Sequence, residues 1–114
     1  MRNILIIGII ALVAAGCSSS TTMVANSCGS SGASANINTS SSNSFSPGSA
    51  TITAGQSVCW QNSSSVAHTV TSDNAVFDSN LPVGQIFLRS FATAGSFPYH
   101  CKIHAGMTGT ITVN

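Results

Sequence analysis

The sequence contains very little charge. Lysine and arginine together number three, aspartate and glutamate two, and charged residues make up 4% of the 114 residues. Without Arg2, which lies in an apolar N-terminal leader, two basic residues balance two acidic ones. Such a chain has no basic face for nucleic acid and no acidic tail for a cationic partner. We therefore expect any partner to be met through apolar and hydrogen-bonding surface.

The chain also lacks an apolar run of transmembrane length. The run over residues 4–15 is about 12 residues long, whereas a helix needs roughly 20 to cross a bilayer. Arg2 followed by a short apolar stretch is typical of an export signal, and we predict a signal peptide over residues 1–16. A membrane anchor and a buried helix are the alternatives.

The sequence Ala14-Ala15-Gly16-Cys17 resembles the lipobox of bacterial lipoproteins. The resemblance implies cleavage before Cys17 and a lipid on that cysteine. Ala14 departs from the pattern, since a larger aliphatic residue is commoner there, and plain secretion is the alternative. The lipid would hold the protein on a membrane outside the cytoplasm, in the periplasm or at the cell surface.

Apolar residues are scarce between the leader and the rest of the chain. Residues 17–32 consist mainly of serine, threonine, glycine and asparagine. Such a segment cannot bury enough apolar surface to offset its ordering entropy. We predict a flexible, Ser-rich tether over residues 17–32 and a folded domain over residues 33–114.

No segment of this domain repeats apolar residues with a helical period. Short runs with alternating apolar residues are instead separated by glycine, proline, asparagine or serine, which is typical of an all-β sandwich. We predict a two-sheet, antiparallel or mixed Greek-key sandwich. Its seven strands are expected at residues 33–39, 49–53, 56–61, 67–72, 85–91, 96–101 and 108–113. Alternation places Trp60 in the core and Cys59 on the opposite face.

One predicted strand carries a charge on its apolar face. Arg89 is in phase with Phe87 and Phe91, and a buried unpaired guanidinium is very costly. We expect a bulge, a strand end or a carboxylate partner there, with Asp73 and Asp78 as the candidates.

The C-terminal part contains Cys101, His104 and Met107 at Cys-x2-His-x2-Met spacing, directly after a predicted strand. A thiolate, an imidazole and a weaker thioether are the ligand types of a blue-copper site. Cys-x2-His alone also occurs in zinc sites. His100 points to the opposite face from its neighbour Cys101, which leaves His68 as the second imidazole.

Two of the four cysteines remain after these assignments. If Cys17 carries lipid and Cys101 binds metal, Cys28 and Cys59 are left, and spare cysteines usually pair in an oxidising compartment. We predict a disulfide between Cys28 and Cys59, with two free thiols as the alternative.

Residues 101–113 resemble the ligand loop and last strand of small blue-copper cupredoxins of the plastocyanin and amicyanin type. The gap between His104 and Met107 is closest to that of amicyanin. The likeness extends upstream through residues 45–47, 51–62 and 68–70 in the family's order. It implies one type 1 copper ion cycling between Cu(I) and Cu(II), with His68, Cys101 and His104 as trigonal ligands and Met107 as the axial contact. Thr69 stands where these families often have an asparagine that ties the two ligand segments together.

The resemblance implies a monomeric electron carrier that shuttles single electrons between membrane-associated redox partners. Four ligands leave no open coordination position, so no catalysis is expected. Partners would dock at an apolar patch around His104, with Pro82, Ile103 and Ala105 as candidate members. Storage, buffering or delivery of copper is the alternative function, and a structural zinc site in an adhesion-like sandwich is a third.

Overall fold

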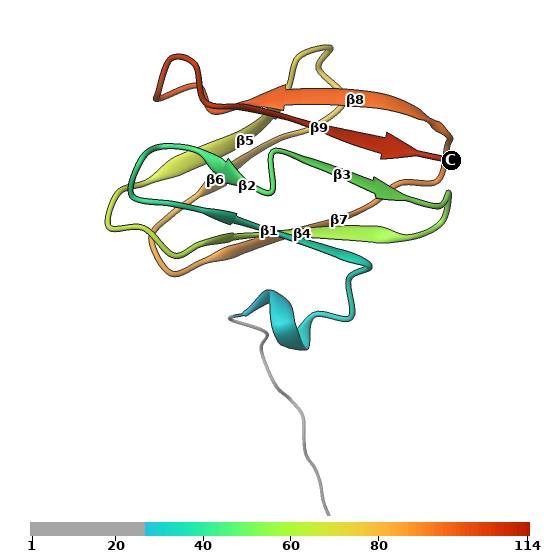
Figure 1. Ribbon diagram of the computed structural model, residues 1–114, viewed down its shortest axis with the longest axis horizontal. Coiled ribbons are helices and arrows are strands. Elements are labelled where there is room, and N and C mark those ends of the chain that lie inside the picture. The colour runs from blue at the N-terminus through green and yellow to red at the C-terminus, as the bar shows by residue number, and fades with distance from the viewer. Residues whose placement is uncertain (1–26) are drawn as a thin grey trace, which may run out of the picture.

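The computed structural model describes residues 27–114, which form two facing β-sheets and one short 3₁₀ helix (Figure 1). The four-stranded sheet has the order β2–β1–β4–β7, and the five-stranded sheet has the order β3–β9–β8–β5–β6. Two neighbouring pairs, β1 with β4 and β3 with β9, are parallel, and the others are antiparallel. The predicted all-β, two-sheet mixed sandwich is confirmed.

The prediction of seven strands was too low. The first sheet contains β1 (Ala35–Thr39), β2 (Phe45–Ser46), β4 (Ser57–Asn62) and β7 (Ile86–Ser90). The second contains β3 (Ser49–Ile52), β5 (His68–Ser72), β6 (Asp78–Leu81), β8 (Gly95–His100) and β9 (Thr108–Val113). The pattern missed β2, which has two residues, and β6, which contains an aspartate and an asparagine, residue types that are depleted in strands.

The core between the sheets is organised around aromatic side chains. Trp60 of β4 is completely buried, as alternation predicted, and its ring lies 5.4 Å from the rings of both Phe87 and Tyr99. Phe77 and Phe91 extend this cluster at centroid distances of 5.9 and 6.5 Å from Trp60. Large rigid rings shared by both sheets fix the spacing of the strands that carry the site.

The outer face of the four-stranded sheet is covered by the N-terminal part of the described chain. A disulfide joins Cys28, in helix η2 (Cys28–Ser30), to Cys59 of β4, with Cα atoms 5.6 Å apart. The Cys28 N–H also donates to Gln61 Oε1 at 2.9 Å. Figure 1 shows η2 outside this sheet, on the side away from the five-stranded sheet. Cys59 is therefore fully buried although it points away from the core.

Of the three alternatives expected for Arg89, the structure shows a strand end and not a carboxylate partner. Within residues 27–114, Asp73 pairs with His100 and Asp78 with Lys102. The Arg89 guanidinium instead lies over the rings of Phe77 and Phe91, 5.1 and 4.9 Å from their centroids. Arg89 is the penultimate residue of β7, so a strand end combined with cation–π contacts accommodates the charge.

The predicted signal peptide, Cys17 and the tether as far as residue 26 lie outside the described residues. Helix η2 spans three residues, and no helix within residues 27–114 has the length and apolarity to span a membrane.

Candidate metal centre

The candidate ligands come from one end of the five-stranded sheet. His68 is the first residue of β5, and Cys101 directly follows the last residue of β8. The two strands are antiparallel neighbours, and Thr71 is opposite His100. The Thr69 N–H donates to Cys101 Sγ at 3.3 Å, which brings the start of β5 to the thiol.

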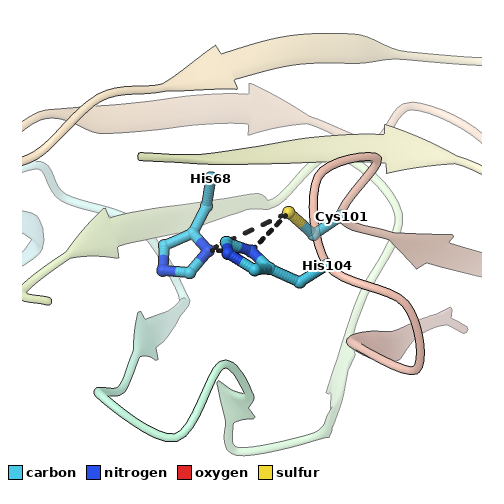
Figure 2. Close-up of side chains that lie close together, drawn as sticks. All are labelled: His68, Cys101 and His104. Atoms are coloured by element: carbon cyan, nitrogen blue, oxygen red, sulfur yellow. Dashed lines mark hydrogen bonds between the residues drawn. The ribbon is translucent and has the colours of Figure 1, made fainter. Parts of the chain in front are cut away.

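Three donor atoms from these segments converge (Figure 2). His68 Nδ1 lies 3.2 Å from His104 Nδ1, and Cys101 Sγ lies 3.9 and 3.6 Å from those two nitrogens. A triangle of this size matches one ion with bonds of roughly 2.0 to 2.3 Å. The structure thus brings His68, Cys101 and His104 together, as the sequence predicted.

Met107 lies at the end of the same loop and is 1% exposed. Its carbonyl accepts the Cys101 N–H at 2.9 Å, and its own N–H donates to the His104 carbonyl at 3.3 Å. These bonds close the loop that carries Cys101 and His104. Gly106 has φ of 81°, a conformation that favours glycine and permits the tight return. The thioether's role as axial ligand stays a prediction.

His68 is 1% exposed, and its ring is contacted at Nε2, the nitrogen that points away from the other donors. Ser64 Oγ lies 2.9 Å from Nε2 of this ring, and it also lies 2.7 Å from Asn62 Oδ1. Because the amide oxygen can only accept, the hydroxyl donates to Asn62 and accepts from the His68 Nε2–H. We assign the tautomer from this pattern, and it leaves the Nδ1 lone pair facing Cys101 and His104.

Burial, and secondarily the charge of His104, lowers the pKa of His68 below its usual value. The neutral imidazole is therefore favoured at neutral pH, and it is the form that binds metal. Desolvation and the Ser64 contact act in the same direction, toward a ring with an available Nδ1 lone pair.

The sequence analysis did not identify Asn62 and Ser64 as functional residues, because they lie between the strands predicted at residues 56–61 and 67–72. The Asn62 side chain is 1% exposed and donates to the carbonyls of Val66 and Leu81 at 2.8 and 2.9 Å. Its Oδ1 accepts from Thr39 Oγ1 at 2.9 Å and from Ser64. Asn62 thus joins both sheets to the loop that leads to His68. An asparagine at a strand end before a serine run was the available signal.

Thr69 connects the two ligand segments, although it stands where the related families often have an asparagine. Its Oγ1 accepts the Lys102 main-chain N–H at 2.8 Å. This hydrogen bond and the contact between the Thr69 N–H and Cys101 connect the two ligand segments directly.

His100 lies apart from the three donors. Its Nδ1 is 2.6 Å from Asp73 Oδ1, and its side chain is 37% exposed. Among the described residues, the histidine, cysteine and acidic side chains that could share an ion are His68, Cys101 and His104. Structural zinc sites usually have four ligands of these types. Three such donors beside a buried methionine therefore fit copper better.

The chain resembles known copper proteins. A family model described as a cupredoxin-like domain matches residues 7–113. Plastocyanin of Scenedesmus fuscus is 37% identical over 84 residues, which cover 60% of this chain and 85% of plastocyanin. These matches agree with the donor set: the residues present fit one type 1 copper ion.

Solved structures support the same relationship. A purple cupredoxin from Nitrosopumilus maritimus has a TM-score of 0.66 and 30% identity, covering 70% of this chain and 99% of that protein. An amicyanin mutant solved with Cu(I) has a TM-score of 0.69 over 80% of this chain and 90% of its own. At 21% identity, the amicyanin match shows the fold alone.

Proposed function

The chain belongs to the family of cupredoxin-like domains, and we propose that it is a blue-copper protein that shuttles single electrons between membrane-associated redox partners outside the cytoplasm. The observation that carries the proposal is the convergence of three donor atoms. The pairwise distances between His68 Nδ1, Cys101 Sγ and His104 Nδ1 are 3.2 to 3.9 Å. Copper bound there supplies a one-electron couple, because thiolate favours Cu(I) and imidazole suits both oxidation states.

In this proposal His68, Cys101 and His104 would hold the copper ion as trigonal ligands, and the buried Met107 would supply a weaker axial contact. Their positions follow from rigid elements: His68 begins β5, Cys101 follows β8, and main-chain hydrogen bonds close the loop to Met107. A donor set held by packed strands changes little when the ion gains or loses an electron. Four ligands leave no position for a substrate, so the proposal includes no enzymatic step.

We place the route for electrons at His104, whose ring is partly exposed between two exposed loop residues, Ile103 and Ala105. Ile103 is 55% exposed. Pro82 is exposed directly after Leu81, the partner of His68 in the β5–β6 register. Because the chain carries little charge, we propose that these apolar residues form the patch at which redox proteins dock. The protein would bind these partners as a monomer. A lipid on Cys17 would keep the domain near membrane-bound partners.

The decisive experiment is a visible spectrum and redox titration of the copper-loaded chain. We expect an intense thiolate-to-Cu(II) band and a reversible one-electron couple. Cys101→Ser should abolish the band while the fold persists, and His100→Ala, the matched control, should keep it. A band that survives in Cys101→Ser would refute the ligand assignment. Rapid loss of the ion to a chelator would instead favour storage or delivery of copper.

A further inference from the structure

Four residues beside the ligand segments form a closed ring of hydrogen bonds. The Lys102 N–H donates to Thr69 Oγ1 at 2.8 Å, and Thr69 Oγ1 lies 3.0 Å from Thr71 Oγ1. Thr71 Oγ1 donates to Asp78 Oδ1 at 2.9 Å, and Asp78 Oδ2 accepts from Lys102 Nζ at 2.9 Å. The ring thus begins and ends at the residue after Cys101.

The register of the sheet explains how these side chains meet. Thr69 and Thr71 alternate with the core residue Val70 on β5, so both lie on the outer face of the sheet. Asp78 of β6 is directly opposite Thr71, which places its carboxylate on the same face. Thr69 and Thr71 are 4% and 9% exposed, so their hydroxyls depend on partners within the protein.

The carboxylate fixes the direction of the whole chain of bonds. Each hydroxyl has one proton, and an ionised carboxylate only accepts. Thr71 must therefore donate to Asp78, which leaves its oxygen to accept from Thr69. Thr69 then has only lone pairs for the Lys102 N–H. In the reverse direction Thr69 Oγ1 would accept from Thr71, and its own proton would have no partner in the ring. The hydroxyl that accepts the Lys102 N–H would then no longer be held in one orientation.

We propose that Asp78 is a positioning residue of the metal centre, which acts through Thr71 and Thr69 to hold the Cys101–Lys102 segment against β5. The Thr69 main chain supplies the second contact, with its N–H 3.3 Å from Cys101 Sγ. The exposed Lys102–Asp78 ion pair contributes little by itself, since its side chains are 50% and 54% exposed. The inference rests on the proposed copper function and extends it to a residue on another strand.

The test is hydrogen exchange of the Lys102 amide in the metal-free full chain, followed by NMR. Asp78→Ala and Thr71→Val should accelerate this exchange roughly three- to tenfold, the effect of weakening one hydrogen bond of ordinary net strength. Thr71→Ser keeps the hydroxyl and Asp78→Asn keeps an acceptor oxygen, so both should retain protection. Ser79→Ala is the matched control on β6, because its hydroxyl bonds the neighbouring Asn80 carbonyl and not the ring.

Unchanged Lys102 exchange in Asp78→Ala would overturn the proposal, and this exposed site can be substituted even if Thr71→Val does not fold. The same variants are then loaded with copper, and their visible bands are compared. A band displaced in Asp78→Ala and Thr71→Val, and restored in Thr71→Ser, supports positioning of the ligands. If wild type itself shows no blue band but the variants exchange faster at Lys102, the role of the hydrogen-bonded ring stands and the proposed copper function is refuted. A normal blue band in wild type, together with unaltered Lys102 exchange in the variants, would sustain the copper function and overturn the positioning role of Asp78.

Discussion

The Nδ1 atoms of His68 and His104 lie 3.2 Å apart, although 36 residues separate them in the chain. Two imidazoles cannot both direct an N–H at each other over this distance, so the contact needs one shared proton or one cation. The Ser64 contact at the far nitrogen of His68 leaves its Nδ1 lone pair in this position. The His68 Nδ1 lone pair can therefore accept a proton shared with His104 or bind a cation between the two rings.

Copper should consequently stabilise the fold through these two rings. With free copper at a hundredfold excess over Kd, the expected gain in the free energy of unfolding is about 2.7 kcal/mol, or roughly 10 °C or more in Tm for a domain of this size. His68→Ala should lose most of this gain and His100→Ala should keep it, as measured by thermal unfolding with and without copper. Equal copper-induced shifts in wild type and His68→Ala would contradict the assignment.

Removing the Ser64 hydroxyl should weaken copper binding without removing a ligand. Ser64→Ala frees the His68 ring to rotate and to change tautomer, and losses of about 10- to 100-fold in affinity are typical when such an outer partner is removed. Competition with a calibrated chelator measures the change. Ser63→Ala is the control, since the Ser63 hydroxyl donates to Asn38 Oδ1 at 2.9 Å, away from His68. Equal affinities of the two variants would show that the Ser64 contact is incidental.

The ligand loop was predictable from sequence because its information is local. Cys101, His104 and Met107 stand in one short segment, and strand alternation was enough to set His100 on the other face. His68 could be named only because the chain contains few histidines and because of the family resemblance. Its approach to the loop depends on the pairing of β5 with β8, which no local pattern specifies.

The residues around the site were harder to predict, because their contacts also depend on strand pairing that no local pattern specifies. The tie from Thr69 to Asp78 joins residues on two strands and a loop, and β6 was not expected at all. Arg89 looked like a buried charge because alternation gives only the face of a strand. It does not give the distance to the strand end, or the aromatic rings over which a guanidinium can lie.

Gly109 is required for space and not for its backbone angle. A Cβ at this position would overlap Cζ and the hydroxyl of Tyr99, and would lie 2.9 Å from Cε1. Tyr99 is fully buried against Phe45 and Trp60, so its ring cannot move aside. Gly109→Ala should cost roughly 1 to 3 kcal/mol in urea unfolding, as overpacking usually does.

Gly48→Ala is the matched control for this substitution. The nearest atom to a Cβ at Gly48 is the Phe45 carbonyl oxygen at 3.9 Å, an ordinary contact. Its effect should therefore stay within about 0.5 kcal/mol. Similar costs at both glycines would show that the Tyr99 contact is not the cause.

Tyr99 should make the fold sensitive to alkaline pH. Burial raises its pKa to about 12, against about 10 in an unfolded chain. Between these values the unfolded chain releases a proton that the folded protein retains, so stability should fall by about 1.4 kcal/mol per pH unit. Within residues 27–114 the phenol also has no hydrogen-bond partner, so Tyr99→Phe should cost little at neutral pH. Urea unfolding from pH 8 to 11.5 should show wild type losing stability above pH 10 relative to Tyr99→Phe, and parallel curves would mean that the phenol ionises freely in the folded protein.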